Sequence, residues 1–142
     1  MFRRQAMTNN HSENIIGLDI GDIKIGVARV HTIAKIPEPL QPFSNDEEFG
    51  SKLLDLLKSQ QSSLVVVGLP RNMSGEETAQ STKIREFVDK IKAKLNGIDF
   101  VFVDESLSSV RADEFMKNLK TEVSQDSIAA CYILQEYLTI KQ

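Results

Sequence analysis

The segment Leu64-Val65-Val66-Val67 is short, wholly apolar and rich in β-branched residues. Such a run is typical of a strand in a parallel sheet that helices cover on both faces. A helical pattern follows it and ends at Asn96-Gly97, and a further strand is predicted over Ile98–Val103. The apolar positions of that helix are Ile84, Phe87, Val88, Ile91 and Leu95. This strand–helix–strand order predicts an α/β fold.

The first half of the chain predicts a hairpin. Ile15–Ile20 is an apolar run, Gly21-Asp22 is a turn signal, and Lys24–Val30 alternates in polarity. A third extended piece is predicted over Thr32–Ile36, where the prolines that follow would stop it. Those prolines are Pro37, Pro39 and Pro42. Residues 1–14 are polar and without periodicity, and we interpret them as a flexible N-terminal arm.

Three further helices complete the expected order β-β-β-α-β-α-β-α-α. Ser44 and Glu47 have the spacing of a capping box, before a helix with Phe49, Leu53, Leu56 and Leu57 on one side. Another helix is predicted to begin at Ser108 or Ser109. The last, over Gln125–Ile140 with Ser124 as its cap, is apolar on nearly every side and must be largely buried. A mixed sheet with helices on both faces follows.

Composition excludes several classes of protein. The chain has 142 residues, which suits one domain, and a formal net charge of −3, unlike a bulk basic protein of the histone type. Its longest apolar run, Leu64–Leu69, is far shorter than the about 20 residues of a membrane span. The single cysteine, Cys131, excludes an intrachain disulfide framework; it fits a reducing cytoplasm and is expected to be a packing residue.

Three carboxylates are candidates for one site. Asp19 lies inside an apolar strand, where a lone charge is expensive to bury. Glu105 follows the last strand, and Asp126 lies in the first turn of the last helix. Taken singly, Glu105 suits a solvated loop and Asp126 suits a helix N-terminus, which favours negative charge. Taken together, such oxygen ligands favour Mg²⁺ or Mn²⁺.

Three cations are candidates for binding phosphate. Lys24 is flanked by Gly21 and Gly26, which would let a phosphate approach the backbone, although a tight hairpin with a solvated lysine explains the pattern equally well. Arg71 lies in the loop after the central strand, where loops face a site at the sheet edge. Arg85 belongs to a locally basic helix, a pattern that more often marks a solvated helix face.

Four stretches in this order resemble the YqgF family of RNase H-fold proteins, which are associated with Holliday-junction resolution and with pre-16S rRNA maturation. They are Gly17–Ala28, Val67–Gly75, Asp104–Val110 and Asp126–Gln135. The resemblance covers about residues 15–138 and implies an RNase H-like fold with a five-stranded mixed sheet. It also implies that residues 15–142 form a single nuclease domain.

Carried over residue by residue, the resemblance makes Asp19, Glu105 and Asp126 catalytic metal ligands. Two cations, Mg²⁺ or Mn²⁺ and roughly 3.5–4 Å apart, would clamp the scissile phosphate, with Asp19 bridging both. Lys24, Arg71 and Arg85 would bind substrate phosphates. The implied activity is metal-dependent cleavage of structured nucleic acid, leading to processing of the 5′ end of pre-16S rRNA, with Holliday-junction resolution as the alternative. The implied partners are nucleic acid and the ribosome, for a cytoplasmic monomer or homodimer without a membrane.

Two other interpretations stay open. The family usually carries an arginine where Ser106 stands and a threonine or serine where Asp22 stands, and the segment before Asp126 is usually longer and rich in lysine. Each departure makes the region less positive, which favours a non-catalytic nucleic-acid-binding protein that kept the fold. Asp19, Gly21 and Lys24 also resemble the phosphate motif of sugar-kinase-like ATPases, although 142 residues supply only one of the two domains such enzymes need.

Overall fold

The computed structural model describes residues 14–70, 74, 76–105 and 125–141. Its five strands form one sheet in the order β3-β2-β1-β4-β5. They are β1 (Asn14–Ile20), β2 (Lys24–His31), β3 (Glu38–Ser44), β4 (Leu64–Pro70) and β5 (Asp99–Glu105). β2 is antiparallel to β1 and to β3, whereas β4 is parallel to β1 and to β5. The predicted mixed sheet of five strands is confirmed.

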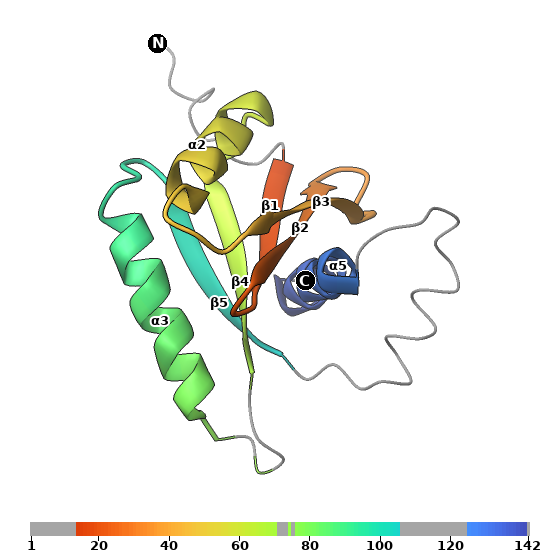
Figure 1. Cartoon of the computed structure of the whole chain (residues 1–142). Coiled ribbons are helices and arrows are strands. Elements are labelled where there is room, and N and C mark those ends of the chain that lie inside the picture. The colour runs from red at the N-terminus through yellow and green to blue at the C-terminus, as the bar shows by residue number, and fades with distance from the viewer. Residues whose placement is uncertain (1–13, 71–73, 75, 106–124, 142) are drawn as a thin grey trace.

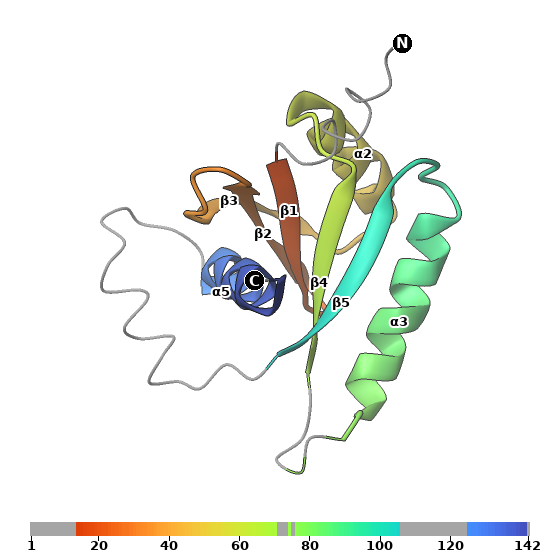
Figure 2. The ribbon, with the colours of Figure 1, turned by 180° about the vertical axis from the view of Figure 1, so that it is seen from behind.

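Helices cover both faces of the sheet, as predicted. α2 (Phe49–Ser59) and α3 (Ala79–Lys92) lie on one side, and α5 (Gln125–Lys141) lies on the other (Figures 1 and 2). Successive side chains of a strand point to opposite faces of the sheet, so β1 contributes to both helix layers. Ile16 and Leu18 pack in the cluster under α2 and α3, and Ile15 packs under α5.

The third strand corrects the sequence prediction. The residues expected to be extended, Thr32–Ile36, form mainly the turn before β3, and β3 contains both Pro39 and Pro42. Two features make this possible. β3 is an edge strand, where a missing N–H is tolerated, and its pairing with β2 shifts register between Ile25 and Val27.

The predicted capping box of Ser44 and Glu47 is wrong. Ser44 is the last residue of β3, and α2 begins at Phe49 after Glu48, whose side chain makes no capping hydrogen bond. The predicted apolar side of α2 is confirmed, with Phe49, Leu53 and Leu57 buried.

A reciprocal capping box does occur at α3, between Thr78 and Ser81. α3 ends at Lys92, before the predicted stop, and Gly97 has a left-handed φ of +82°. β5 continues through Asp104 and Glu105, two residues beyond the predicted strand.

The last helix matches its prediction. α5 runs over Gln125–Lys141, and its first half is buried nearly all round. The proposed cap Ser124, the helix expected after Ser108 or Ser109 and residues 1–13 of the expected arm lie outside the described residues. Asn14 already belongs to β1, and its side-chain amide donates to the carbonyl oxygen of Gln60.

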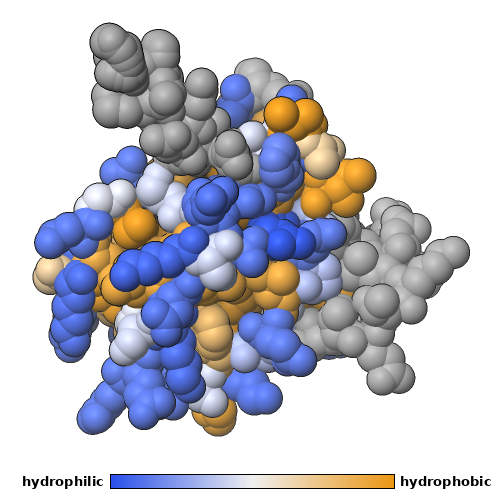
Figure 3. All heavy atoms as spheres, turned by 90° about the horizontal axis from the view of Figure 1, so that it is seen from above, coloured by the Kyte–Doolittle hydropathy of each residue, from blue (hydrophilic) through white to orange (hydrophobic). Residues whose placement is uncertain are grey.

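The surface is mainly hydrophilic where Figure 3 shows the described residues, with apolar side chains in smaller patches. Large exposed apolar side chains include Ile23, Ile33, Ile36 and Ile140. Among the described residues, no helix has the length and apolarity needed to cross a membrane.

Candidate active site at the carboxyl edge of the sheet

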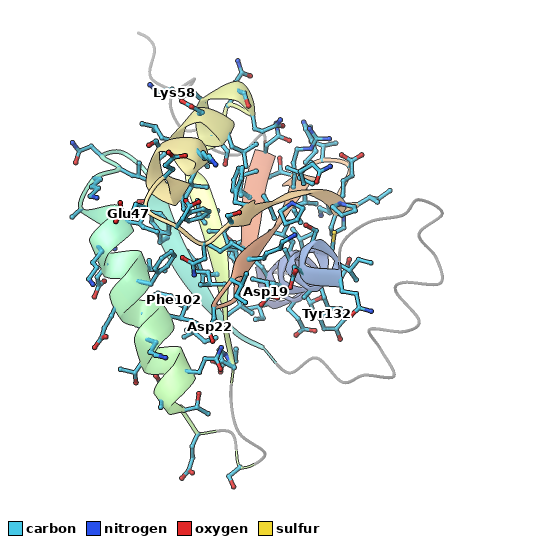
Figure 4. All side chains as sticks on the ribbon, viewed as in Figure 1. Asp19, Asp22, Glu47, Lys58, Phe102 and Tyr132 are labelled. Carbon is cyan, nitrogen blue, oxygen red and sulfur yellow. The ribbon has the colours of Figure 1, made fainter. Side chains whose placement is uncertain are left out.

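Asp19 lies one residue before the end of β1 and is half-buried. Alternate β1 side chains face opposite layers, and Gly17, two residues earlier, lies directly against Leu134 of α5. Asp19 therefore faces the α5 side of the sheet. In Figure 4 it lies at the lower end of the β1–β2 hairpin, near the carboxyl ends of β4 and β5. A carboxylate here is at the edge where parallel α/β sheets place their sites.

Gly26 brings Asp126 to the same place. Gly26 is the β2 residue paired with Asp19, and a Cβ built on it would lie 1.9 Å from the carbonyl oxygen of Asp126. The first turn of α5 therefore rests directly on the backbone of β2, beside the position of Asp19. Only glycine allows this approach, because any side chain would overlap the backbone of the helix.

Ser127 fastens this turn of α5 to the sheet. Its hydroxyl accepts a hydrogen bond from the N–H of Val27 at 3.2 Å and donates one to the carbonyl oxygen of Leu40 at 2.6 Å. Val27 and Leu40 are register partners beside the irregularity in the β2–β3 pairing. The fully buried hydroxyl thus joins β2, β3 and α5 and fixes the position of its neighbour Asp126.

Gly17 supports the same helix further along. A Cβ on it would lie 2.6 Å from Cγ of Leu134 and 3.0 Å from the carbonyl oxygen of Ala130.

Burial raises the pKa of the Cys131 thiol to about 12, with a smaller contribution from the charge of Glu38. A thiol that stays protonated at neutral pH is a packing group, as predicted, rather than a nucleophile.

Lys24 lies at the same edge as Asp19. It is the first residue of β2, its carbonyl oxygen accepts a hydrogen bond from the N–H of Gly21 at 3.0 Å, and its side chain is exposed. The alternation that turns Gly26 and Ala28 toward α5 extends to Lys24. An exposed ammonium therefore stands on the α5 side of the hairpin tip.

Arg85 lies on the opposite side of the sheet from Asp19. Its guanidinium donates to both carboxylate oxygens of Glu77, at 3.1 and 2.8 Å, and lies 5.0 Å from the centre of the Phe102 ring. The hydrogen bond to Glu77 raises the pKa of Arg85, and the charge of Asp104 adds to this. The structure therefore does not bring Arg85 together with Asp19 and Asp126.

Glu105 is the last residue of β5 and pairs with Pro70 at the end of β4, so its backbone lies at the same carboxyl edge. The side chain of Glu105 and all of Arg71 and Ser106 lie outside what the structure describes. Among the described side chains, no group of three acidic, histidine or cysteine residues is placed to hold a metal ion. Of the three candidate acids, the structure describes the side chains of Asp19 and Asp126, which are hard oxygen donors of the kind that suits Mg²⁺ or Mn²⁺.

Sequence reasoning missed the positioning roles of Gly26 and Ser127. Gly26 was interpreted through its neighbour Lys24, although its contact is with a helix a hundred residues later in the chain. The available signal was Ser127 itself, a hydroxyl directly after an acid at the start of an otherwise apolar helix. A buried hydroxyl in such a place needs hydrogen-bond partners, which here come from the sheet.

Comparison with known sequences gives a consistent result. The family described as "RuvX: Holliday junction resolvase" matches residues 13–140. A Fusobacterium nucleatum protein named "Putative pre-16S rRNA nuclease" is 37% identical over 134 residues, covering 89% of this chain and 97% of its own. A Sulfurihydrogenibium protein of the same name is 38% identical over 130 residues, covering 87% of this chain and 88% of its own.

Solved structures support the fold. RuvC of Thermus thermophilus has a TM-score of 0.60 at 10% identity and covers 90% of this chain and 95% of its own. The fowlpox virus resolvase, solved with substrate Holliday junction DNA, has a TM-score of 0.55 at 12% identity and covers 90% of this chain and 98% of its own. The architecture is therefore RNase H-like, and the match over residues 13–140 shows that the chain belongs to the RuvX family, also known as YqgF.

Proposed function

We propose that this protein is a metal-dependent endonuclease that hydrolyses phosphodiester bonds in structured nucleic acid, at the 5′ end of pre-16S rRNA. The observation that carries the proposal is the contact between Gly26 and Asp126. Through it, the backbone positions of Asp19 in the first strand and Asp126 in the last helix become neighbours on one side of the sheet. Carboxylate oxygens are the ligands that Mg²⁺ and Mn²⁺ prefer, so this edge of the sheet is suited to hold such a cation.

The chemistry follows from the donor set. Asp19, Asp126 and Glu105 would hold the cation, which when bound supplies an activated water and stabilises the leaving oxygen. The chain's own contribution is positioning. Ser127 holds the first turn of α5 on β2, and the buried first half of α5 keeps the helix packed on the sheet.

Substrate binding falls to exposed cations near this edge. Lys24 stands on the α5 side of the hairpin tip and would bind a backbone phosphate next to the one that is cut. Arg71, in the segment after β4, would bind another. Arg85 has no place in this scheme, because Glu77 occupies its guanidinium on the other side of the sheet.

RNA is the proposed substrate because the similar sequences carry the name of a pre-16S rRNA nuclease. This activity would bring the protein to the assembling ribosome in the cytoplasm. The description of the family as Holliday junction resolvases favours branched DNA as the second candidate. A resolvase would need a dimer to cut both strands symmetrically, whereas a monomer suffices to trim RNA.

Parallel assays separate the candidates. The full-length protein is incubated with a labelled pre-16S rRNA fragment and with a four-way DNA junction, each with Mn²⁺, with Mg²⁺ and with chelator. We expect metal-dependent cleavage of the RNA. Symmetric cleavage of the junction alone would identify a resolvase, and binding of either substrate without any cleavage would favour the non-catalytic interpretation.

A further inference from the structure

A hollow of about 150 Å³ lies on the other side of the hairpin tip from Asp19. It is lined by Ile20, Gly21, Asp22, Asn45, Gln80, Lys83, Ile84 and Phe87. These residues come from the end of β1, the following turn, the segment after β3 and the first nine residues of α3. Figure 4 shows Asp22 toward the α3 side of the tip, with Asp19 nearer α5. The hollow and the candidate active site thus share one turn of backbone.

One wall of the hollow is apolar and firmly packed. Ile20 and Ile84 are buried in the cluster under α2 and α3. Phe87 is half-buried and stacks on Phe49, with ring centres 5.8 Å apart and planes at 28°. The wall therefore stays in place when something binds to it, and it offers ring-sized apolar surface to a ligand.

The rim of the hollow is polar and fixed at one point. The side-chain nitrogen of Asn45 donates to the carbonyl oxygen of Gly21 at 2.7 Å, which orients the amide and leaves its oxygen as an acceptor. Asp22, Gln80 and Lys83 are exposed, and Lys83 makes no ion pair with any residue of the described ranges. The rim thus combines acceptors, an amide that both donates and accepts, and one cation.

Size narrows the class of ligand. An apolar cavity of about 150 Å³ admits benzene. A six-membered ring with polar edges therefore fits this hollow, with the edges toward the amides and the carboxylate and the flat surface toward Phe87. The cation at the rim suits a ligand that carries a phosphate beside its ring.

We propose that this hollow binds an unstacked base, of pyrimidine size, from the nucleic-acid strand that is cut at Asp19 and Asp126. The inference rests on the proposed function. Ile20 and Asp19 are consecutive residues with side chains on opposite sides of the sheet, so a strand that crosses the hairpin tip reaches both. Lys24 on one side of the tip and Lys83 on the other would bind the phosphates that flank the crossing.

The test measures how much a single base contributes to the affinity of the protein for an oligonucleotide. The Asp19→Asn protein, which we expect to bind without cutting, is titrated with single-stranded oligonucleotides in Mg²⁺. One abasic nucleotide is moved through the sequence position by position. At one position near the cleaved bond, loss of the base should weaken binding about tenfold, the effect of losing one stacked base.

The double substitution Asp22→Ala and Gln80→Ala, made in the same background, removes polar groups at the rim without touching the apolar wall. It should reduce the tenfold preference for the intact base to about threefold or less. Lys90→Met is the matched control, because Lys90 is an exposed residue of α3 that does not line the hollow. It should leave the preference unchanged. A fluorescent pyrimidine analogue at the same position should brighten on binding as it leaves the stack.

The outcomes separate this inference from the function on which it rests. Cleavage by the wild-type protein with no base-dependent position in the scan would overturn the inference alone. An equal preference in the rim variant and in Lys90→Met would also overturn it. Absence of both binding and cleavage would overturn the proposed function as well.

Discussion

The two sides of the sheet are built in different ways. Under α2 and α3, large side chains fill the space, with Phe49, Leu53 and Leu57 fully buried. Under α5, Gly17 and Gly26 take the place of side chains, and the hydroxyl of Ser127 joins the layers. Both sides gain stability from buried apolar area, but the second also brings helix and sheet backbones together. The candidate active site lies on the second side, where close approach determines the position of a carboxylate.

The largest stability effect is expected on the α2 side. Leu53→Ala removes a fully buried side chain far from the acids and should cost about 2–5 kcal/mol of unfolding free energy. Denaturant unfolding measures the loss. Cleavage per folded molecule should stay near the wild-type value at low temperature, and a large drop in it would show that the two sides are not independent.

Gly26→Ala tests the close contact between β2 and α5 directly. The new methyl group would overlap the backbone of Asp126, so α5 must move, at a cost of about 3 kcal/mol. The displaced Asp126 should lower cleavage by more than about 10-fold, since catalytic groups depend on placement.

Gly50→Ala is the matched control, because a Cβ there has nothing within 4 Å and Gly50 lies in a helix. It should leave cleavage unchanged and raise stability by about 0.4–1 kcal/mol. If Gly26→Ala behaved in the same way, the close seating of α5 would be irrelevant to the site.

Ser127→Ala is a milder test of the same seating. It leaves the N–H of Val27 and the carbonyl of Leu40 without their hydroxyl partner, which should cost about 1–3 kcal/mol. Cleavage should fall less than in Gly26→Ala, because the helix keeps its apolar contacts. Ser51→Ala, at an exposed position of α2, serves as the control for loss of a hydroxyl. Thermal unfolding and cleavage of both variants, measured side by side, give the comparison.

Metal binding should give the smallest effect. Saturating Mg²⁺ or Mn²⁺ that binds the folded protein should stabilise it by about 1 kcal/mol or more. This corresponds to a rise of roughly 2–8 °C in melting temperature. The variant with Asp19→Asn and Asp126→Asn should show no rise. An equal shift in both proteins would place the bound cation elsewhere.

The sequence predicted the helices on both sides of the sheet better than the contacts that join them to the sheet. Periodicity identified α2, α3 and their apolar positions, because burial on one face leaves a regular pattern. It misplaced β3, because Pro39 and Pro42 are tolerated only through an edge position and an irregular pairing, which depend on the neighbouring strand. Of the proposed site, Asp19 stood out by its place inside an apolar strand, and Asp126 only through the set of three acids and the family resemblance. The role of Gly26 was not identified, because it depends on a contact made only after folding.

The most direct test compares two acids on opposite sides of the same sheet edge. Asp19 faces α5, whereas Asp104, near the end of β5, acts on Arg85 on the α3 side. Asp19→Asn and Asp104→Asn remove the same charge, and both are assayed on the pre-16S rRNA fragment with Mn²⁺. We expect Asp19→Asn to lower cleavage activity by more than about 100-fold, because loss of a residue that only hydrogen-bonds to a metal ligand already costs up to that much. Asp104→Asn should keep activity within a few-fold of wild type. Equal activity of the two variants, or a larger loss in Asp104→Asn, would contradict a nuclease site on the α5 side.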